Sequence, residues 1–198
     1  MSRRRPAICR SAVATGRGDD GTTGLLYGGR IAKDDPRTEA YGSVDEAVAA
    51  LGLARTESAA AGLSELAASV LRWQRELFVV GAELATNERA RDRLQDGLTR
   101  VSEAMLDGLE TELARWEAGV QMPREFVVPG ESRASAALEV ARTVLRRAER
   151  RVISLQRSGQ WQGEWVVPYL NRLADLVWVL ARSAEQAEQR SATPAREK

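Results

Sequence analysis

Arginines at helical spacing are the residues of this sequence best suited to bind an anion. They lie in the segment 129–155, on or beside one helical face and together with a glutamate: Arg142, Arg146, Arg147, Glu149 and Arg150. This spacing stacks guanidinium groups about one turn apart, where like charges repel unless an anion lies among them. The planar fork of arginine can pair with phosphate or carboxylate at two points. The row therefore suggests a phosphate-bearing ligand, although a solvated helix face is the commoner reason for such a pattern.

A second candidate for phosphate binding is the glycine-rich stretch 15–30, TGRGDDGTTGLLYGGR. So much glycine beside threonine hydroxyls and Arg17 can bring backbone N–H groups close to a phosphate chain. The stretch has neither the spacing of a Walker A loop nor the strand-loop-helix context of a dinucleotide fingerprint. A flexible loop or a small hairpin explains the glycines at least as well.

Composition excludes several kinds of chemistry. The 198 residues include no histidine and one cysteine, Cys9, which rules out an imidazole base or ligand, an intramolecular disulfide and a cysteine-rich zinc site. The net charge of +1 gives no general reason to bind nucleic acid. No apolar run is long enough to span a membrane. A reducing cytoplasm is therefore the expected location.

The candidate residues require helices to position them, and apolar residues at three- and four-residue steps predict five. The first starts with a capping box of Ser43 and Glu46, the second runs over 63–84 and the third over about 98–118. The fourth is the arginine-rich helix, capped by Ser132, and the fifth starts near Pro168. No strand-like alternation is evident. The fold class expected is an all-α five-helix bundle, with one domain over 15–187, a flexible basic tail over 1–14 and a disordered polar tail over 188–198.

Other polar or isolated residues have structural explanations as well. Asp45 falls in the first turn of the expected first helix, where the helix dipole favours a carboxylate. Phe126 lies in the connector between the third and fourth helices, and such a residue usually anchors its loop to the core. Asn171 and Asp175 share a face of the fifth helix, where an asparagine is mildly unfavourable unless its amide finds a partner.

Four segments occur in an order that resembles one known family: TGRGDDGTTGL, KDDPRTEAYGSVDE, FVVPG followed by ARTVLRRAERRV, and YLNRLADLVWVLAR. Together they span roughly residues 15–185. They resemble the PduO-type ATP:corrinoid adenosyltransferases. The resemblance implies a homotrimer of five-helix bundles with active sites between subunits. It also implies transfer of the 5′-deoxyadenosyl group of ATP to the cobalt of cob(I)alamin, with release of triphosphate and use of Mg²⁺.

The resemblance further implies which residues form the site. The ATP-binding positions are Thr15, Gly16, Arg17, Gly18, Thr23, Lys33, Arg146, Arg147, Glu149, Arg150 and Asn171. The catalytic positions are Asp45, Phe126, Arg142 and Arg146, with Asp45 pairing with Arg142 across the subunit boundary. Phe126 walls off the lower face of the corrin and keeps the cobalt four-coordinate, and Asp175 is a second cobalamin-binding residue. No protein residue is implied as a metal ligand. Gly16 stands where the family usually has a lysine.

Two other functional classes compete with the transferase. A non-catalytic bundle that binds a nucleotide or adenosylcobalamin, as sensor or carrier, agrees with the absence of that lysine. A nucleic-acid module would use the arginine row, but the near-neutral charge argues against it. For the transferase, the implied partners are a corrinoid reductase and an adenosylcobalamin-dependent enzyme, with no nucleic acid and no membrane.

Overall fold

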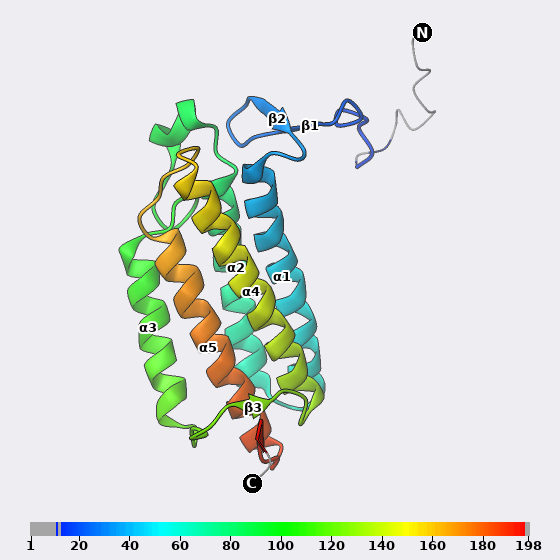
Figure 1. The fold of residues 1–198 in the computed structure, drawn as a ribbon, viewed down its shortest axis with the longest axis vertical. Helices are drawn as coiled ribbons and strands as arrows, with labels where there is room; N and C mark the ends of the chain where they lie inside the picture. Colours follow the sequence, from blue (N-terminus) through cyan, green and yellow to red (C-terminus); the bar gives the residue numbers. More distant parts are fainter. Residues whose placement is uncertain (1–10, 12, 197–198) are drawn as a thin grey trace.

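Five long helices run side by side in the structure, a computed structural model that describes residue 11 and residues 13–196 (Figure 1). They are α1 (Pro36–Ala60), α2 (Ser64–Leu84), α3 (Glu103–Ala118), α4 (Arg133–Arg157) and α5 (Val166–Ala187). The prediction of a helical bundle is confirmed. Most of the tail predicted over 1–14 lies outside the described residues. None of the described helices combines the length and the apolar character needed to cross a bilayer.

Helix α4 lies between α1 and α5 and packs extensively against both. Ser132 caps it as predicted: its hydroxyl accepts from the backbone N–H of Ser135, whose own hydroxyl accepts from the N–H of Ser132. The apolar stripe of the helix is fully buried at Ala141, Leu145 and Ala148. Burial of this stripe on two neighbours fixes the rotation of α4, and thereby the direction of its arginines.

The predicted start of the first helix is wrong. Helix α1 begins at Pro36, where the side chain of Asp35 accepts from the N–H of Arg37 and proline is well placed because it lacks a donor. Ser43 lies inside the helix, where its hydroxyl donates to the carbonyl of Glu39. Asp45 is therefore an exposed residue of the helix interior, and the helix dipole does not explain it.

Two other helix starts differ by a few residues. Helix α3 starts at Glu103, not near residue 98, because a turn occupies the residues before it. In this turn Gly97 adopts a φ of 74°, and its N–H donates to the carbonyl of Arg100. Helix α5 starts at Val166, so that Pro168 lies in its first turn. The charged segment between α2 and α3 forms a 3-10 helix, η1 (Glu88–Arg93).

Short strands are present where the sequence shows no alternation. Strand β1 (Thr22–Gly24) pairs antiparallel with β2 (Arg30–Ala32) in a hairpin at one end of the bundle (Figure 1). At the opposite end, β3 (Val127–Val128) pairs antiparallel with β4 (Thr193–Pro194). The predicted polar tail thus contains a strand that holds the α3–α4 connector, and the N–H of Ala195 donates to the carbonyl of Phe126 at 2.7 Å.

Candidate active site

The arginines of α4 point in two directions. Arg142 and Arg146 lie one turn apart on the side of α4 that faces α5, and both line a cavity of about 320 Å³. Arg147 and Arg151 lie on the side that faces α1, where they pair with Glu46 and Glu39 respectively. A row that looks continuous in sequence is therefore divided between two helix interfaces.

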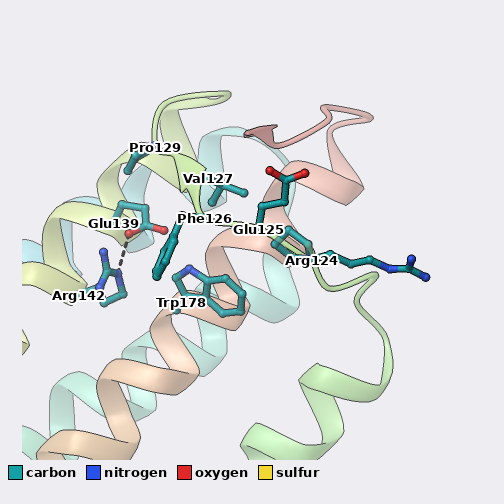
Figure 2. Close-up of a pocket in the computed structure, with 9 residues that line it drawn as sticks. Arg124, Glu125, Phe126, Val127, Pro129, Glu139, Arg142 and Trp178 are labelled. Atoms are coloured by element: carbon teal, nitrogen blue, oxygen red, sulfur yellow. Dashed lines mark hydrogen bonds and ion pairs between the residues drawn. The ribbon is translucent and has the colours of Figure 1, made fainter. Parts of the chain in front are cut away.

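The Arg142 side also borders a second cavity, of about 430 Å³, beneath the α3–α4 connector. Figure 2 shows the ring of Phe126 extending toward Arg142 and Trp178. Phe126 is 88% exposed, so it does not anchor its loop in the core. The commoner interpretation of a connector phenylalanine therefore fails here, and an exposed aromatic ring beside a cavity is suited to contact an apolar ligand.

The 320 Å³ cavity is the more polar of the two. Besides Arg142 and Arg146, its lining includes Glu117 of α3 and Asp175 and Trp178 of α5. Asp175 pairs with Arg172 at 3.0 Å, whereas Arg146 makes no ion pair with any described residue. Since Arg142 and Trp178 line both cavities, they form the boundary between the cavity that contains the unpaired Arg146, called the cationic cavity, and an aromatic one.

The remaining α4 and α5 candidates lie further along the same helices. The amide of Asn171 donates to Glu149 at 3.1 Å, which provides the partner that an asparagine in a helix interior needs. Arg150 donates to the carbonyl of Arg146 at 3.0 Å and is exposed.

The glycine-rich stretch folds into the hairpin and a preceding turn. Lys33 approaches the backbone of Gly18 so closely that a Cβ placed on this glycine would lie 2.9 Å from Nζ. The N–H of Lys33 donates to the carbonyl of Gly21 at 2.9 Å, which ties the turn to β2. The structure thus brings together two of the predicted ATP-binding residues. Thr15, Gly16 and Arg17 are exposed in the turn, and Thr23 lies in β1.

Arg30, which the sequence analysis did not select, organises this turn. Its guanidinium donates to the carbonyl of Arg17 at 2.5 Å and to the hydroxyl of Thr22, and it pairs with Asp20 at 3.4 Å. Hydrogen bonds from the side chain and backbone of Thr22, together with the charge of Arg30, lower the pKa of the Asp20 carboxyl. The turn therefore keeps the Asp20 carboxylate ionised and paired with Arg30.

The glycine-rich turn and the α4 arginines do not meet within one chain. Among the described residues, no hydrogen bond or ion pair joins residues 15–33 to α4, and the hairpin lies at the end of the bundle away from Phe126 (Figure 1). Asp45 also lies apart from Arg142: it lines a cavity of about 400 Å³ between α1 and α2, beside the exposed ring of Phe78. A site that contains all the predicted residues would need more than one copy of the chain.

Trp178, Glu139 and Arg182 are further residues at the site that sequence reasoning missed. Trp178 lies on α5 and is the half-buried boundary of both cavities. Glu139 and Arg182 are buried and paired with each other at 3.2 Å. The sequence contained a signal for this pair, because a charged residue on the apolar face of a helix usually has a buried partner.

These features define a class: a five-helix bundle in which an arginine-lined cavity adjoins an aromatic one, with a glycine-rich turn that presents a lysine. Such a site can hold a polyphosphate next to a large apolar group.

The sequence narrows this class to one family. The family description of cobalamin adenosyltransferases matches residues 13–184. A corrinoid adenosyltransferase of Citrobacter freundii is 41% identical over 173 residues, which cover 87% of this chain and 94% of the relative. One from Bacillus subtilis is 40% identical over 83% of this chain and 82% of its own length. The chain belongs to the cobalamin adenosyltransferase family.

Solved structures agree with this assignment. A variant PduO-type ATP:corrinoid adenosyltransferase from Lactobacillus reuteri, complexed with cobalamin and ATP, superposes with a TM-score of 0.79 at 30% identity. The match covers 92% of this chain and 98% of that one. A second variant of that enzyme, complexed with ATP, gives a TM-score of 0.78 at 29% identity, over 93% of this chain and 100% of the other.

Proposed function

We propose that this enzyme transfers the 5′-deoxyadenosyl group of ATP to the cobalt of cob(I)alamin, yielding adenosylcobalamin and triphosphate. The observation that carries the proposal is the pair of adjoining cavities that share Arg142 and Trp178. The cationic cavity is suited to the polyphosphate and the aromatic one to the corrin. Membership of the cobalamin adenosyltransferase family supports the same reaction.

The reaction needs no protein base. The Co(I) electron pair attacks C5′ of ATP, the new Co–C bond forms as the C5′–O bond breaks, and triphosphate leaves with the bonding electrons. No proton moves, which agrees with a sequence that contains no histidine. The protein's contribution is to position the two substrates and to stabilise the charge that develops on the leaving triphosphate.

Arg146 is our principal candidate for that stabilisation. It lines the cationic cavity and has no ion-pair partner among the described residues. Arg142, one turn away, adds a second guanidinium, and the repulsion between the two would be relieved by a bound polyphosphate. Phe126, exposed beside the aromatic cavity, is our candidate to cover one face of the corrin and to displace an axial ligand from the cobalt. Asp175 borders the cationic cavity and is our candidate for a polar contact to the corrin periphery.

We place the complete site between subunits of a homotrimer. Asp45 lies in the α1–α2 cavity and makes no ion pair with a described residue of its own chain. Its pairing with Arg142 of a neighbour would join these two surfaces. The same arrangement would bring the glycine-rich turn of one chain to the arginines of another, with Thr15, Gly16, Arg17, Gly18, Thr23 and Lys33 at the triphosphate.

The other residues predicted to contact ATP differ in whether their side chains already have partners within the chain. Asn171 and Glu149 form a hydrogen-bonded pair that could position the adenosyl moiety. Arg150 is exposed, and it would reach a ligand by leaving the carbonyl of Arg146. Arg147 is held by Glu46 in this chain, so it would reach a phosphate only by leaving that carboxylate.

We infer that Mg²⁺ would enter with ATP. Within the described ranges, no group of three or more histidine, cysteine, aspartate or glutamate side chains could hold a metal ion. Mg²⁺ at nucleotide sites typically keeps several waters and uses substrate phosphates with one or two carboxylates, so a site of this kind fits the chain. When bound, the ion would neutralise phosphate charge. The cytoplasmic location, the reductase and the recipient enzyme remain predictions.

The test is anaerobic. The purified protein is mixed with chemically generated cob(I)alamin, ATP and Mg²⁺, and the corrin absorbance is followed. An ATP-dependent change to the adenosylcobalamin spectrum is expected, with one triphosphate released per product. ATP binding without that change would favour the non-catalytic sensor or carrier. Failure to bind ATP at all would point to Gly16, where the family's lysine is missing.

A further inference from the structure

Charged side chains form a connected row between α4 and α5 that ends at the candidate site. In order from the buried end, they are Glu185, Arg182, Glu139 and Arg142. The first three residues are only 2%, 3% and 4% exposed, whereas the side chain of Arg142 is 26% exposed and borders both cavities. The row therefore connects the interior of the bundle to the site.

Glu139 is held at both carboxylate oxygens. Its Oε1 accepts from Nη2 of Arg182 at 3.2 Å, and its Oε2 accepts from Nε of Arg142 at 2.6 Å (Figure 2). The Arg182 nitrogen also donates to Glu185 at 2.9 Å. While one oxygen is bound to a buried guanidinium, the other is directed to Arg142.

Arg182 makes this arrangement rigid. Its Nε and Nη1 have no hydrogen-bond partner among the described residues, and its guanidinium lies 5.7 Å from the ring centroid of Trp178. A buried cation requires its counter-charges to remain in place. Movement of Glu139 away from Arg182 would remove one of the two ion pairs of a buried cation, and this cost favours Glu139 as an anchor for Arg142.

We propose that Glu139 is the positioning residue for Arg142, holding its guanidinium at the boundary of the two cavities so that the terminal nitrogens remain available to the substrates and to Asp45 of the partner subunit. The inference rests on the proposed transfer reaction. The bond to Glu139 uses only Nε, so Nη1 and Nη2 are not consumed by it. Fixing an arginine before the substrate arrives lowers the entropy cost of charge stabilisation in the transition state.

The decisive experiment is a double-mutant cycle with Glu139→Gln and Arg142→Lys. Lysine keeps the charge but lacks the Nε that Glu139 binds. We measure kcat and KM for ATP with cob(I)alamin and Mg²⁺, and also ATP affinity by titration and thermal unfolding. Glu112→Gln is the matched control, because Glu112 also pairs with an arginine three residues later, at 2.8 Å, on the exposed side of α3.

We expect Glu139→Gln to lower kcat about tenfold in the parent and to have almost no further effect in the Arg142→Lys background, since residues that act as a unit are not additive. Glu112→Gln should retain parental kinetics. Equal losses in both backgrounds, or an unchanged kcat in Glu139→Gln, would overturn the inference.

A second variant covers the case in which Glu139→Gln does not fold. Glu139→Asp keeps the charge beside Arg182 but withdraws the carboxylate from Arg142 by one methylene. It should fold, bind ATP and show the same loss of kcat, and parental kinetics in this variant would contradict a positioning role. A parent that makes no adenosylcobalamin would instead refute the proposed function, so the two failures are distinguishable.

Discussion

Arg146 and Arg147 are neighbours in the sequence, yet α4 presents them to different surroundings. Arg146 lines the cationic cavity beside α5 and has no ion-pair partner among the described residues. Arg147 pairs with Glu46 of α1, and one turn on, Arg151 pairs with Glu39 at 3.0 Å. Side chains of one residue type thus serve a cavity on one side of the helix and a helix interface on the other.

The difference shows how a helix can carry more arginines than its ligand requires. The pairs with α1 are about half exposed at both partners, so each contributes only about 0.2–1 kcal/mol to stability. On the α5 side, two guanidinium groups lie one turn apart, and Arg142 alone has a counter-charge, from Glu139. A guanidinium that has no ion-pair partner among the described residues favours an anionic ligand in the adjoining cavity, although Glu117 and Asp175 also line that cavity.

The sharpest test of this comparison replaces Arg146 and Arg147 by glutamine in two separate variants. Arg146→Gln should lower kcat/KM by about 100-fold, as expected for the loss of one group that stabilises transition-state charge. Stability and oligomeric state should not change, because the side chain is exposed. Adenosylation kinetics and sedimentation would check both. Near-parental activity in Arg146→Gln would remove the reason for assigning the cationic cavity to triphosphate.

The aromatic cavity can be tested separately from the cationic one. Phe126→Ala should lower turnover by at least about tenfold, a loss of 1.4 kcal/mol or more in transition-state stabilisation. ATP affinity should be retained because Phe126 is not among the residues that line the cationic cavity. The absorbance of bound cob(II)alamin should lose its four-coordinate features. A variant with the parental cobalt spectrum would argue against contact between Phe126 and the corrin.

Arg147→Gln should have a much smaller effect than Arg146→Gln. We expect a loss of about 0.2–1 kcal/mol in the free energy of unfolding, since an exposed ion pair with Glu46 is removed. Activity should fall only a few-fold, and added salt should reduce the difference in stability. A loss of ATP affinity comparable to that of Arg146→Gln would mean that Arg147 leaves Glu46 to bind the nucleotide.

The smallest expected effect concerns the contribution of Glu185 to stability, at the buried end of the charged row between α4 and α5. Burial raises the pKa of the Glu185 carboxyl above its ordinary value of 4.5, although the charge of Arg182 and a hydrogen bond from Ser135 oppose the shift. Between 4.5 and the raised pKa, the folded state holds the proton more tightly than the unfolded state. The contribution of Glu185 to stability is therefore present at low pH and is lost as the pH rises.

Chemical unfolding of the parent and of Glu185→Gln, from pH 4 to pH 7, would measure this contribution. The free energy of unfolding of the parent minus that of Glu185→Gln should decrease as the pH rises. Glu46→Gln, on the exposed α1 side, serves as the control. A difference that increases with pH would show that pairing with Arg182 outweighs burial.

Much of the fold could be predicted from the sequence because local rules govern it. Apolar spacing identified the five helices, and Ser132 was recognised as the cap of α4 because the capping signal lies within four residues. The start of α1 was misplaced because two local signals competed: Asp35 with Pro36, and Ser43 with Glu46. Both obey capping rules, and the contacts of the first turn favoured the earlier one.

The sequence by itself determined that α4 carries a row of arginines, that no imidazole takes part and that Phe126 lies between two prolines in a short connector. Only the tertiary structure decided which arginines face a cavity, because helical spacing gives the angle between side chains but not what lies opposite them. Packing of α1 and α5 on either side of α4 supplied Glu46 to Arg147, buried Glu139 and Arg182 together, and left Arg146 unpaired. The pairing of β3 with β4 left the Phe126 ring exposed at the cavity, since backbone contacts hold its loop in place of core packing.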